Sequence, residues 1–210
     1  MPFFMTINLK IQTQQIVDAL NEVYNIEELL RNHSIVYPQK CRSDADLLLL
    51  CEKYLEKDIR VMTHETQWDG GSIVAFIVTY QTYFDICLLD GMNHCHQTFA
   101  LCKELFHTII QNAEFRSIDF ENTIDECYAG GSLSGIAASE YTAEIAAMEY
   151  LFPFKDRLKI VQQETIDFDA VAQEYKIPRL RIEKYLTPFR METLKKCYSA
   201  SSYAKVVETV

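Results

Sequence analysis

The chain has 210 residues, of which 49% are hydrophobic and 12% are aromatic, so it can bury a core that suits one compact domain. Its 30 acidic and 20 basic residues give a formal net charge of −10. This balance opposes non-specific binding to nucleic acid or to an anionic membrane surface, because the basic surplus that neutralises phosphates is missing. We therefore expect neither direct nucleic-acid binding nor membrane binding.

Cysteine usage indicates the compartment. The seven cysteines are scattered and never form a C-x-x-C pair, which argues against a disulfide framework. The first five residues, MPFFM, lack the charged-then-apolar pattern of a leader, and no apolar run reaches the roughly 18 residues of a membrane span. We expect a reduced, cytoplasmic protein.

Two helices are predicted in the N-terminal part. Between residues 11 and 32, apolar side chains recur at helical spacing, with an interruption near Asn25. A second helix is predicted to begin at Ser43, whose hydroxyl can cap the amides of the sequence DADLLLLCEKYLEK that follows.

From Arg60 the pattern changes to short runs that favour strands, RVMTHE, SIVAFIVTY and YFDICLL. The letters DGG at positions 69–71 are typical of a turn between the first two runs. We predict a small, mainly antiparallel sheet that ends near residue 90.

Helical spacing returns over residues 97–113 and again over 138–152, where Pro153 ends the helix. The glycine-containing segment 114–139 between them is predicted to be a connection. The last part of the chain predicts a pair of short helices on either side of positions 176–178, which read KIP.

These elements predict one α+β domain over residues 1–210, with helices in residues 10–60, the sheet and two further helices in 60–153, and a C-terminal helical part in 154–210. We find no internal repeat and no low-complexity linker. The helix predicted over residues 97–113 therefore follows directly after the sheet.

The helix predicted after the sheet carries the letters K-E-L-F-H, with Lys103, Glu104 and His107 at its key positions. A zinc hydrolase helix reads H-E-x-x-H, because residues four apart share one face and two imidazoles can hold one ion while the glutamate activates its water. Here a lysine stands in the place of the first histidine. Taken alone, E-x-x-H is a weak signal, since any amphipathic helix can carry a Glu and a His three apart.

The second helix supplies two carboxylates. In ASEYTAEIAAMEYLFP, Glu140 and Glu144 share a face with Ala143 and Ala147. This face is either a solvated acidic surface or a tight contact that brings a carboxylate to the metal position, and the small alanines favour the contact. We predict that His107 and Glu140 face each other across it.

These two stretches, FALCKELFH and EYTAEIAAMEYLFP, resemble the motifs of the ImmA/IrrE family of metallopeptidases, and the second begins 33 residues after His107. The resemblance spans most of residues 10–190 and implies a zincin-like metallopeptidase fold with a C-terminal helical pair. It implies that Glu104 is the general base, His107 the second zinc ligand and Glu140 the third. Glu144 falls where the family has an Asn or Asp that supports the ligands.

The chain departs from the family pattern at two positions. Lys103 replaces the first ligand and Phe106 replaces a small residue. A catalytic zinc ion needs three protein ligands, and a lysine amine binds metal only after it loses a proton with an ordinary pKa of about 10.4. An ammonium at this position would instead lie among Glu104, Glu140 and Glu144 and supply the charge that zinc supplies in the family. We therefore expect zinc to be weakly bound or absent.

Other possible ligands precede the motif. His94, Cys95 and His96 are close in sequence, but on one helix His96 would lie about 16 Å along the axis from His107, too far to share an ion. Cys102 is predicted to pack in the core.

Three functions follow from these observations. The first, which we prefer, is a catalytically impaired or inactive peptidase-like protein that binds a protein or peptide partner beside the edge of its sheet, and the resemblance implies a repressor-type partner. The second is an active zinc endopeptidase with an altered ligand set and Glu104 as its base. The third is a DNA-binding regulator that uses the basic residues of the C-terminal helices, Lys176, Arg179, Arg181 and Lys184, against the net charge of the chain.

Overall fold

A computed structural model describes the backbone of residues 2–32, 42–67, 74–110 and 135–204, and the side chains of residues 13–29, 42–67, 74–110 and 139–204. These residues form an α+β structure of eight helices and one three-stranded sheet. In chain order the elements are α1 (Pro2–Asn32), α2 (Asp44–Leu55), β1 (Asp58–Gln67), β2 (Ala75–Thr79), β3 (Tyr83–Asp90), α3 (His94–Ile109), α5 (Gly135–Leu151), α6 (Phe154–Ile160), α7 (Phe168–Tyr175), α8 (Arg179–Tyr185) and α9 (Pro188–Ala200).

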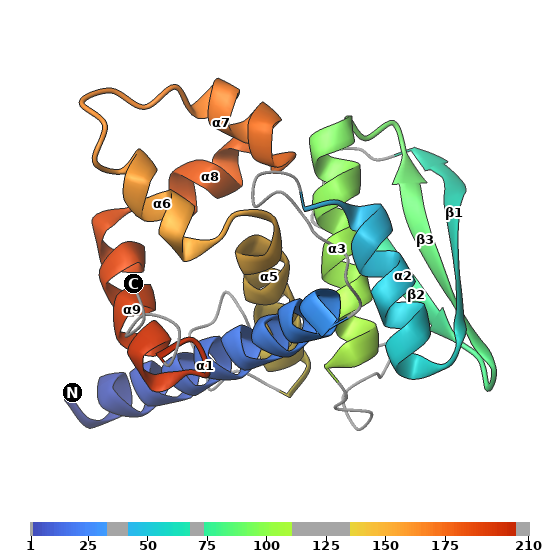
Figure 1. Cartoon of the computed structure of the whole chain (residues 1–210), viewed down its shortest axis with the longest axis horizontal. Coiled ribbons are helices and arrows are strands. Elements are labelled where there is room, and N and C mark those ends of the chain that lie inside the picture. The colour runs from blue at the N-terminus through green and yellow to red at the C-terminus, as the bar shows by residue number, and fades with distance from the viewer. Residues whose placement is uncertain (1, 33–41, 68–73, 111–134, 205–210) are drawn as a thin grey trace.

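The elements lie in layers (Figure 1). The sheet forms one side of the molecule, α2 and α3 lie next to it, α5 is central, and α6 to α9 lie on the opposite side. The long α1 runs beneath α5 and contacts both α5 and α9. None of the described helices combines the length and the apolar character needed to cross a bilayer.

The two N-terminal helices form, although α1 begins at Pro2, earlier than the predicted range 11–32. The Ser43 hydroxyl accepts a hydrogen bond from the Asp46 amide at 3.1 Å, which confirms the predicted start of α2. The interruption predicted in α1 is wrong, because the helix continues through Asn25. Asn25 is exposed while Val23 and Ile26 are buried, so its polar side chain changes only the solvent-facing side.

The sheet is mixed, so the prediction of a mainly antiparallel sheet is wrong. β3 is the central strand, with β2 antiparallel on one side and β1 parallel on the other. Alternation of apolar residues reports which face of a strand is buried but not the direction of its neighbour, and it therefore did not reveal the parallel pair. The turn predicted at 69–71 lies outside the described residues, whereas the predicted end of the sheet near residue 90 is confirmed.

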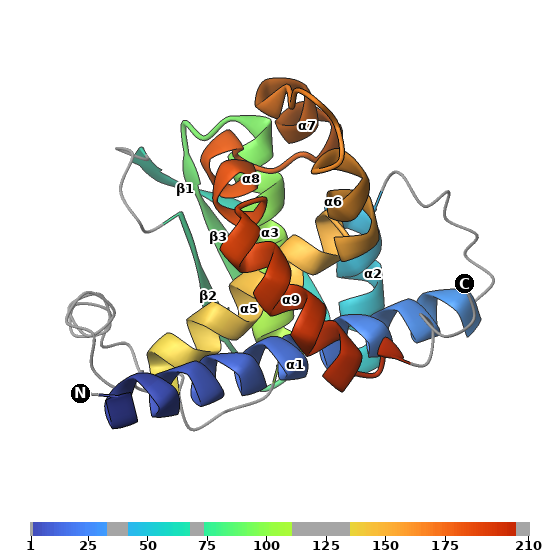
Figure 2. The same ribbon diagram turned by 90° about the vertical axis from the view of Figure 1, so that its left-hand side faces the viewer.

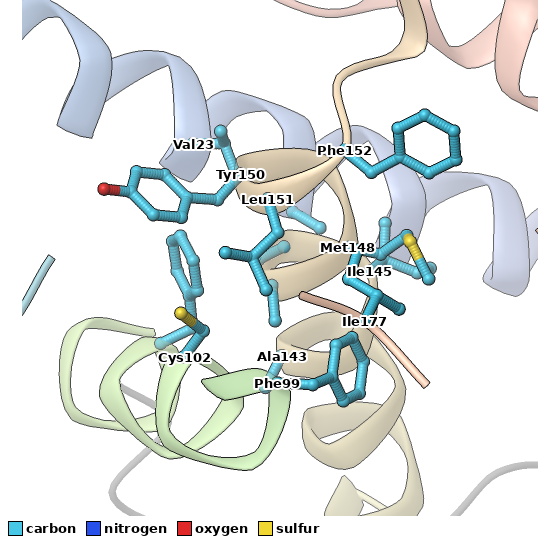
Figure 3. Close-up of a cluster of buried hydrophobic side chains, with 14 of the residues drawn as sticks. Val23, Phe99, Cys102, Ala143, Ile145, Met148, Tyr150, Leu151, Phe152 and Ile177 are labelled. Carbon is cyan, nitrogen blue, oxygen red and sulfur yellow. The ribbon is translucent and has the colours of Figure 1, made fainter. Parts of the chain in front are cut away.

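The helix pair predicted around the motif forms, and α3 packs against α5. Figure 3 shows Phe99 and Cys102 of α3 close to the part of α5 that carries Ala143. Ala143 and Ala147 are fully buried, as expected where two helix backbones approach closely. The burial of Cys102 confirms its predicted place in the core.

The C-terminal helices share this core. The predicted pair is confirmed as α7 and α8, joined through Lys176 in the left-handed conformation, with φ 54°. Ile177, in the same turn, is fully buried beside Ile145 and Met148 of α5 (Figure 3). Two further helices, α6 and α9, were not predicted. Pro153 is the N-cap residue of α6, and Pro188 is the first residue of α9.

A buried ion pair joins α5 to α6. Arg157 Nη2 lies 2.6 Å from Glu149 Oε2, and these side chains are 2% and 1% exposed. The other oxygen of Glu149 accepts hydrogen bonds from the Phe154 amide at 2.9 Å and the Tyr198 hydroxyl at 2.7 Å. Arg157 Nε also donates to the Phe152 carbonyl at 2.6 Å. The pair therefore connects the end of α5 to both α6 and α9.

We expect Arg157→Met to lower the free energy of unfolding by about 3–5 kcal/mol, because it leaves the Glu149 carboxylate buried without its cation. The double variant Glu149→Leu/Arg157→Met should recover part of this loss, since no charge then remains buried. Urea denaturation measures both. The control is Lys159→Ala, which removes an exposed pair with Asp156 and should change stability by less than about 0.5 kcal/mol. An unchanged unfolding midpoint for Arg157→Met would contradict the role of the pair.

Candidate functional site

The residues of the motif meet Glu140 at the contact between α3 and α5. Lys103 and His107 lie one turn apart on α3, and both contact the Glu140 carboxylate. Lys103 Nζ pairs with Glu140 Oε2, and His107 Nε2 lies 3.1 Å from Glu140 Oε1. The predicted approach of His107 and Glu140 across the helix contact is thus confirmed.

Lys103 is a largely buried cation between two carboxylates. Its side chain is 18% exposed, and Nζ also lies 3.6 Å from Glu104 Oε1. Burial lowers the pKa of Lys103, but the charges of Glu104 and Glu140 outweigh burial and raise it above its ordinary value. The side chain is therefore an ammonium ion at neutral pH.

Glu140 is held as a carboxylate. Burial raises its pKa, but the hydrogen bond from His107 and the charge of Lys103 act more strongly together, and the pKa falls from 4.5 to about 2. A carboxylate whose two oxygens contact an imidazole and an ammonium stabilises the contact between the two helices.

Sequence reasoning missed Ser139. Its hydroxyl lies 3.4 Å from Nδ1 of His107, so one imidazole contacts two neighbouring residues of α5, Ser139 and Glu140. The position directly before Glu140 was the available signal. Adjacent helical residues usually point in different directions, however, and the spacing alone did not place both on one histidine.

Glu104 and Phe106 lie inside the protein. Glu104, which the sequence resemblance implied as a general base, is buried beside Lys103. The Phe106 ring is fully buried and packs edge-on against Tyr150, with ring centroids 6.1 Å apart. Phe106 therefore packs in the core of the helix pair.

Glu144 faces a different set of cations. It pairs with Arg181 of α8, lies 3.4 Å from Lys184 Nζ and accepts a hydrogen bond from the Tyr185 hydroxyl at 3.0 Å. Burial raises the pKa of Glu144, but Arg181 and Lys184 lower it below its ordinary value. Glu144 was predicted to lie beside the Lys103 ammonium, together with Glu104 and Glu140. It acts on Lys103 through its charge, while its direct contacts fasten α8 to α5.

Three of the four basic residues considered for DNA binding, Arg179, Arg181 and Lys184, have partners within the protein. Arg181 and Lys184 contact Glu144, and Arg179 pairs with Asp169 and Glu183, both at 2.7 Å. Binding a phosphate would have to compete with these carboxylates. These contacts therefore join α8 to α5 and to α7.

The residues present do not fit a zinc ion. His107 and Glu140 supply a nitrogen and an oxygen donor, but the third position is occupied by Lys103, whose ammonium has no lone pair and binds Glu140 itself. Within the described ranges, no three His, Cys, Asp or Glu side chains are grouped to hold a metal. Upstream, His96 contacts Asn93 and the Cys95 thiol lies near the Ala172 carbonyl at 3.6 Å, so neither is directed to the motif.

Comparisons with known proteins add little to this geometry. No family model matches the chain, and no curated protein matches it. A solved structure described as a Mycobacterium tuberculosis transcriptional regulator is similar at 11% sequence identity, with a TM-score of 0.47, over 81% of this chain and 50% of that chain. The chain thus spans about half the length of that regulator.

The low pKa of Glu140 predicts a pH dependence. A carboxylate with a lowered pKa stabilises the fold above its ordinary pKa, and this contribution is lost as pH falls from about 5 to about 2. The Glu140 side chain is 36% exposed, so solvent screening reduces the effect, and we expect Glu140→Gln to be less stable than wild type by about 1 kcal/mol at pH 7. The difference should disappear as the pH approaches 2.

Urea denaturation of both proteins between pH 7 and the acid limit measures this difference. The control is Glu174→Gln, on the exposed side of α7, which should follow the wild-type curve. If the difference in the free energy of unfolding between wild type and Glu140→Gln stays constant down to acid pH, the carboxylate of Glu140 is not stabilised by its two partners.

Proposed function

We propose that this chain is an ImmA/IrrE-type, zincin-like protein that acts by binding a protein partner and not by zinc-dependent hydrolysis. The contact between the Lys103 ammonium and Glu140 is the observation that carries this proposal. A metallopeptidase needs three protein ligands and an open position for water. With an ammonium in contact with the third expected ligand, His107 and Glu140 alone form a poor zinc site.

The sheet offers a surface for such a partner. β1 is an edge strand, with β3 as its strand partner in the described sheet, and nine of its ten residues are exposed. A free strand edge can accept an extended peptide, whose backbone pairs with the edge while alternate side chains contact the exposed surface. Val61 and Met62 are 39% and 42% exposed on this strand and would supply apolar contacts.

A DNA-binding repressor is the partner that the family resemblance suggests. Binding would control such a regulator without cutting it, for example by holding a segment of it in extended form. The net charge of −10 favours recognition of a protein over recognition of the DNA that the repressor binds.

An active zinc endopeptidase is the second candidate. The approach of His107 Nε2 to Glu140 Oε1 at 3.1 Å favours it, because two of the three expected ligands are already together. In this alternative, His107 and Glu140 would hold the ion, which would supply a Lewis acid, and Glu104 would accept a proton from water. It requires Lys103 to leave Glu140 and a third ligand to take its place.

The two candidates differ in the effect of Glu104→Gln. If the protein acts by binding, wild type and Glu104→Gln should bind a candidate repressor with the same Kd, with zinc or with EDTA, and neither should cleave it. Fluorescence anisotropy of labelled repressor measures binding, and intact-mass spectrometry measures cleavage. Zinc-dependent cleavage by the wild type that Glu104→Gln abolishes would establish the endopeptidase instead.

The surface has its own test. Met62→Glu should weaken binding of the repressor roughly tenfold, because it places a charge within the apolar contact beside the strand edge. The matched control is Leu49→Glu, which changes a residue of α2 that is 64% exposed and should leave the Kd unchanged. Equal binding by wild type and Met62→Glu would show that the partner does not use β1.

A further inference from the structure

We propose that the Lys103 ammonium is a permanent internal cation that joins α3 to α5 in place of a metal ion and closes the site to metals. The site would then be one substitution away from binding Zn²⁺. This inference uses the position that the proposed family assigns to Lys103, but it concerns the isolated chain and does not depend on any partner.

The first support is the way Glu140 is shared. One of its oxygens pairs with Lys103 and the other with His107, so the carboxylate bridges two residues of α3. Together they form a cross-link between the two central helices. Zinc makes a comparable cross-link when its ligands come from two helices.

The second support is the spacing of the remaining donors. A tetrahedral zinc ion about 2.0–2.1 Å from a nitrogen and an oxygen holds these atoms roughly 3.3–3.4 Å apart. In this protein, Nε2 of His107 and Oε1 of Glu140 are 3.1 Å apart. The two atoms therefore already lie near the separation that a shared ion requires. Metal binding would need a third lone pair at position 103 and the displacement of the Nε2 proton that His107 donates to Glu140.

The third support is burial and charge balance. The Lys103 side chain is 18% exposed and faces both Glu104 and Glu140, which would repel each other without a cation between them. An exposed lysine with one partner would contribute little. A buried lysine between two carboxylates instead stabilises the contact between the helices.

Removing the cation tests its structural role. Lys103→Met keeps most of the apolar stem of the side chain and removes the ammonium, so its Tm should fall by roughly 4–8 °C. In Lys103→Ala, the space left by the side chain should accept propylammonium, which should restore part of the lost Tm, whereas butane-1-sulfonate should not. Lys184→Met is the matched control, because Lys184 also contacts a glutamate but is 49% exposed, and its Tm should change little.

Restoring a lone pair tests the latent metal site. Lys103→His should bind one Zn²⁺ per chain by isothermal titration calorimetry, and saturating zinc should raise its Tm by roughly 5–10 °C. The wild type should show neither effect. Lys103→His/His107→Ala should lose the zinc response, since it removes one of the three ligands.

Equal Tm values for wild type and Lys103→Met, or no effect of zinc on Lys103→His, would overturn the proposal. If Lys103→Met does not fold, the Lys103→His variant replaces it as the test, because its folding should then depend on added zinc. Stoichiometric zinc in the wild type would also overturn it.

Discussion

The close contact between α3 and α5 is the constraint on which the other features depend. The buried alanines of α5, among them Ala143 and Ala147, allow the two helices to approach closely enough for side chains on either side to pair. The same contact brings Lys103 and His107 to Glu140 and buries Phe99 against α5. Without these small residues, the charged groups at the contact would remain apart and solvated.

Three carboxylates along α5 bind side chains of the neighbouring helices. Glu140 binds residues of α3, Glu144 binds cations of α8, and Glu149 binds Arg157 of α6 together with the Tyr198 hydroxyl of α9. Figure 2 shows α8 and α9 in front of α3 and α5, where these contacts attach them. Each of the three carboxylates along α5 thus binds a different helix, and its charge is balanced by a cation of that helix.

Under the proposed family assignment, this arrangement would explain how the site can lack one metal ligand. A zinc ion at the contact would neutralise Glu140 and Glu104, and the Lys103 ammonium supplies positive charge in the same neighbourhood. In that proposal, the ammonium would keep the helices together without supplying the Lewis acid that activates water. The proposed binding function and the proposed internal cation therefore both depend on Lys103, although each has a separate test.

The sequence by itself determined the helices with a periodic apolar face, the strand-favouring runs, the cap at Ser43, and the meeting of His107 with Glu140. Composition favours strands, and spacing places residues on one face of a helix. It could not determine the parallel pairing of β1, the helices α6 and α9, the contact of Ser139 with His107, or the turn of Glu144 towards α8. These depend on which elements become neighbours and on where side chains find opposite charges. Only the tertiary structure decided them, because pairing and charge balance are properties of contacts between segments far apart in the chain.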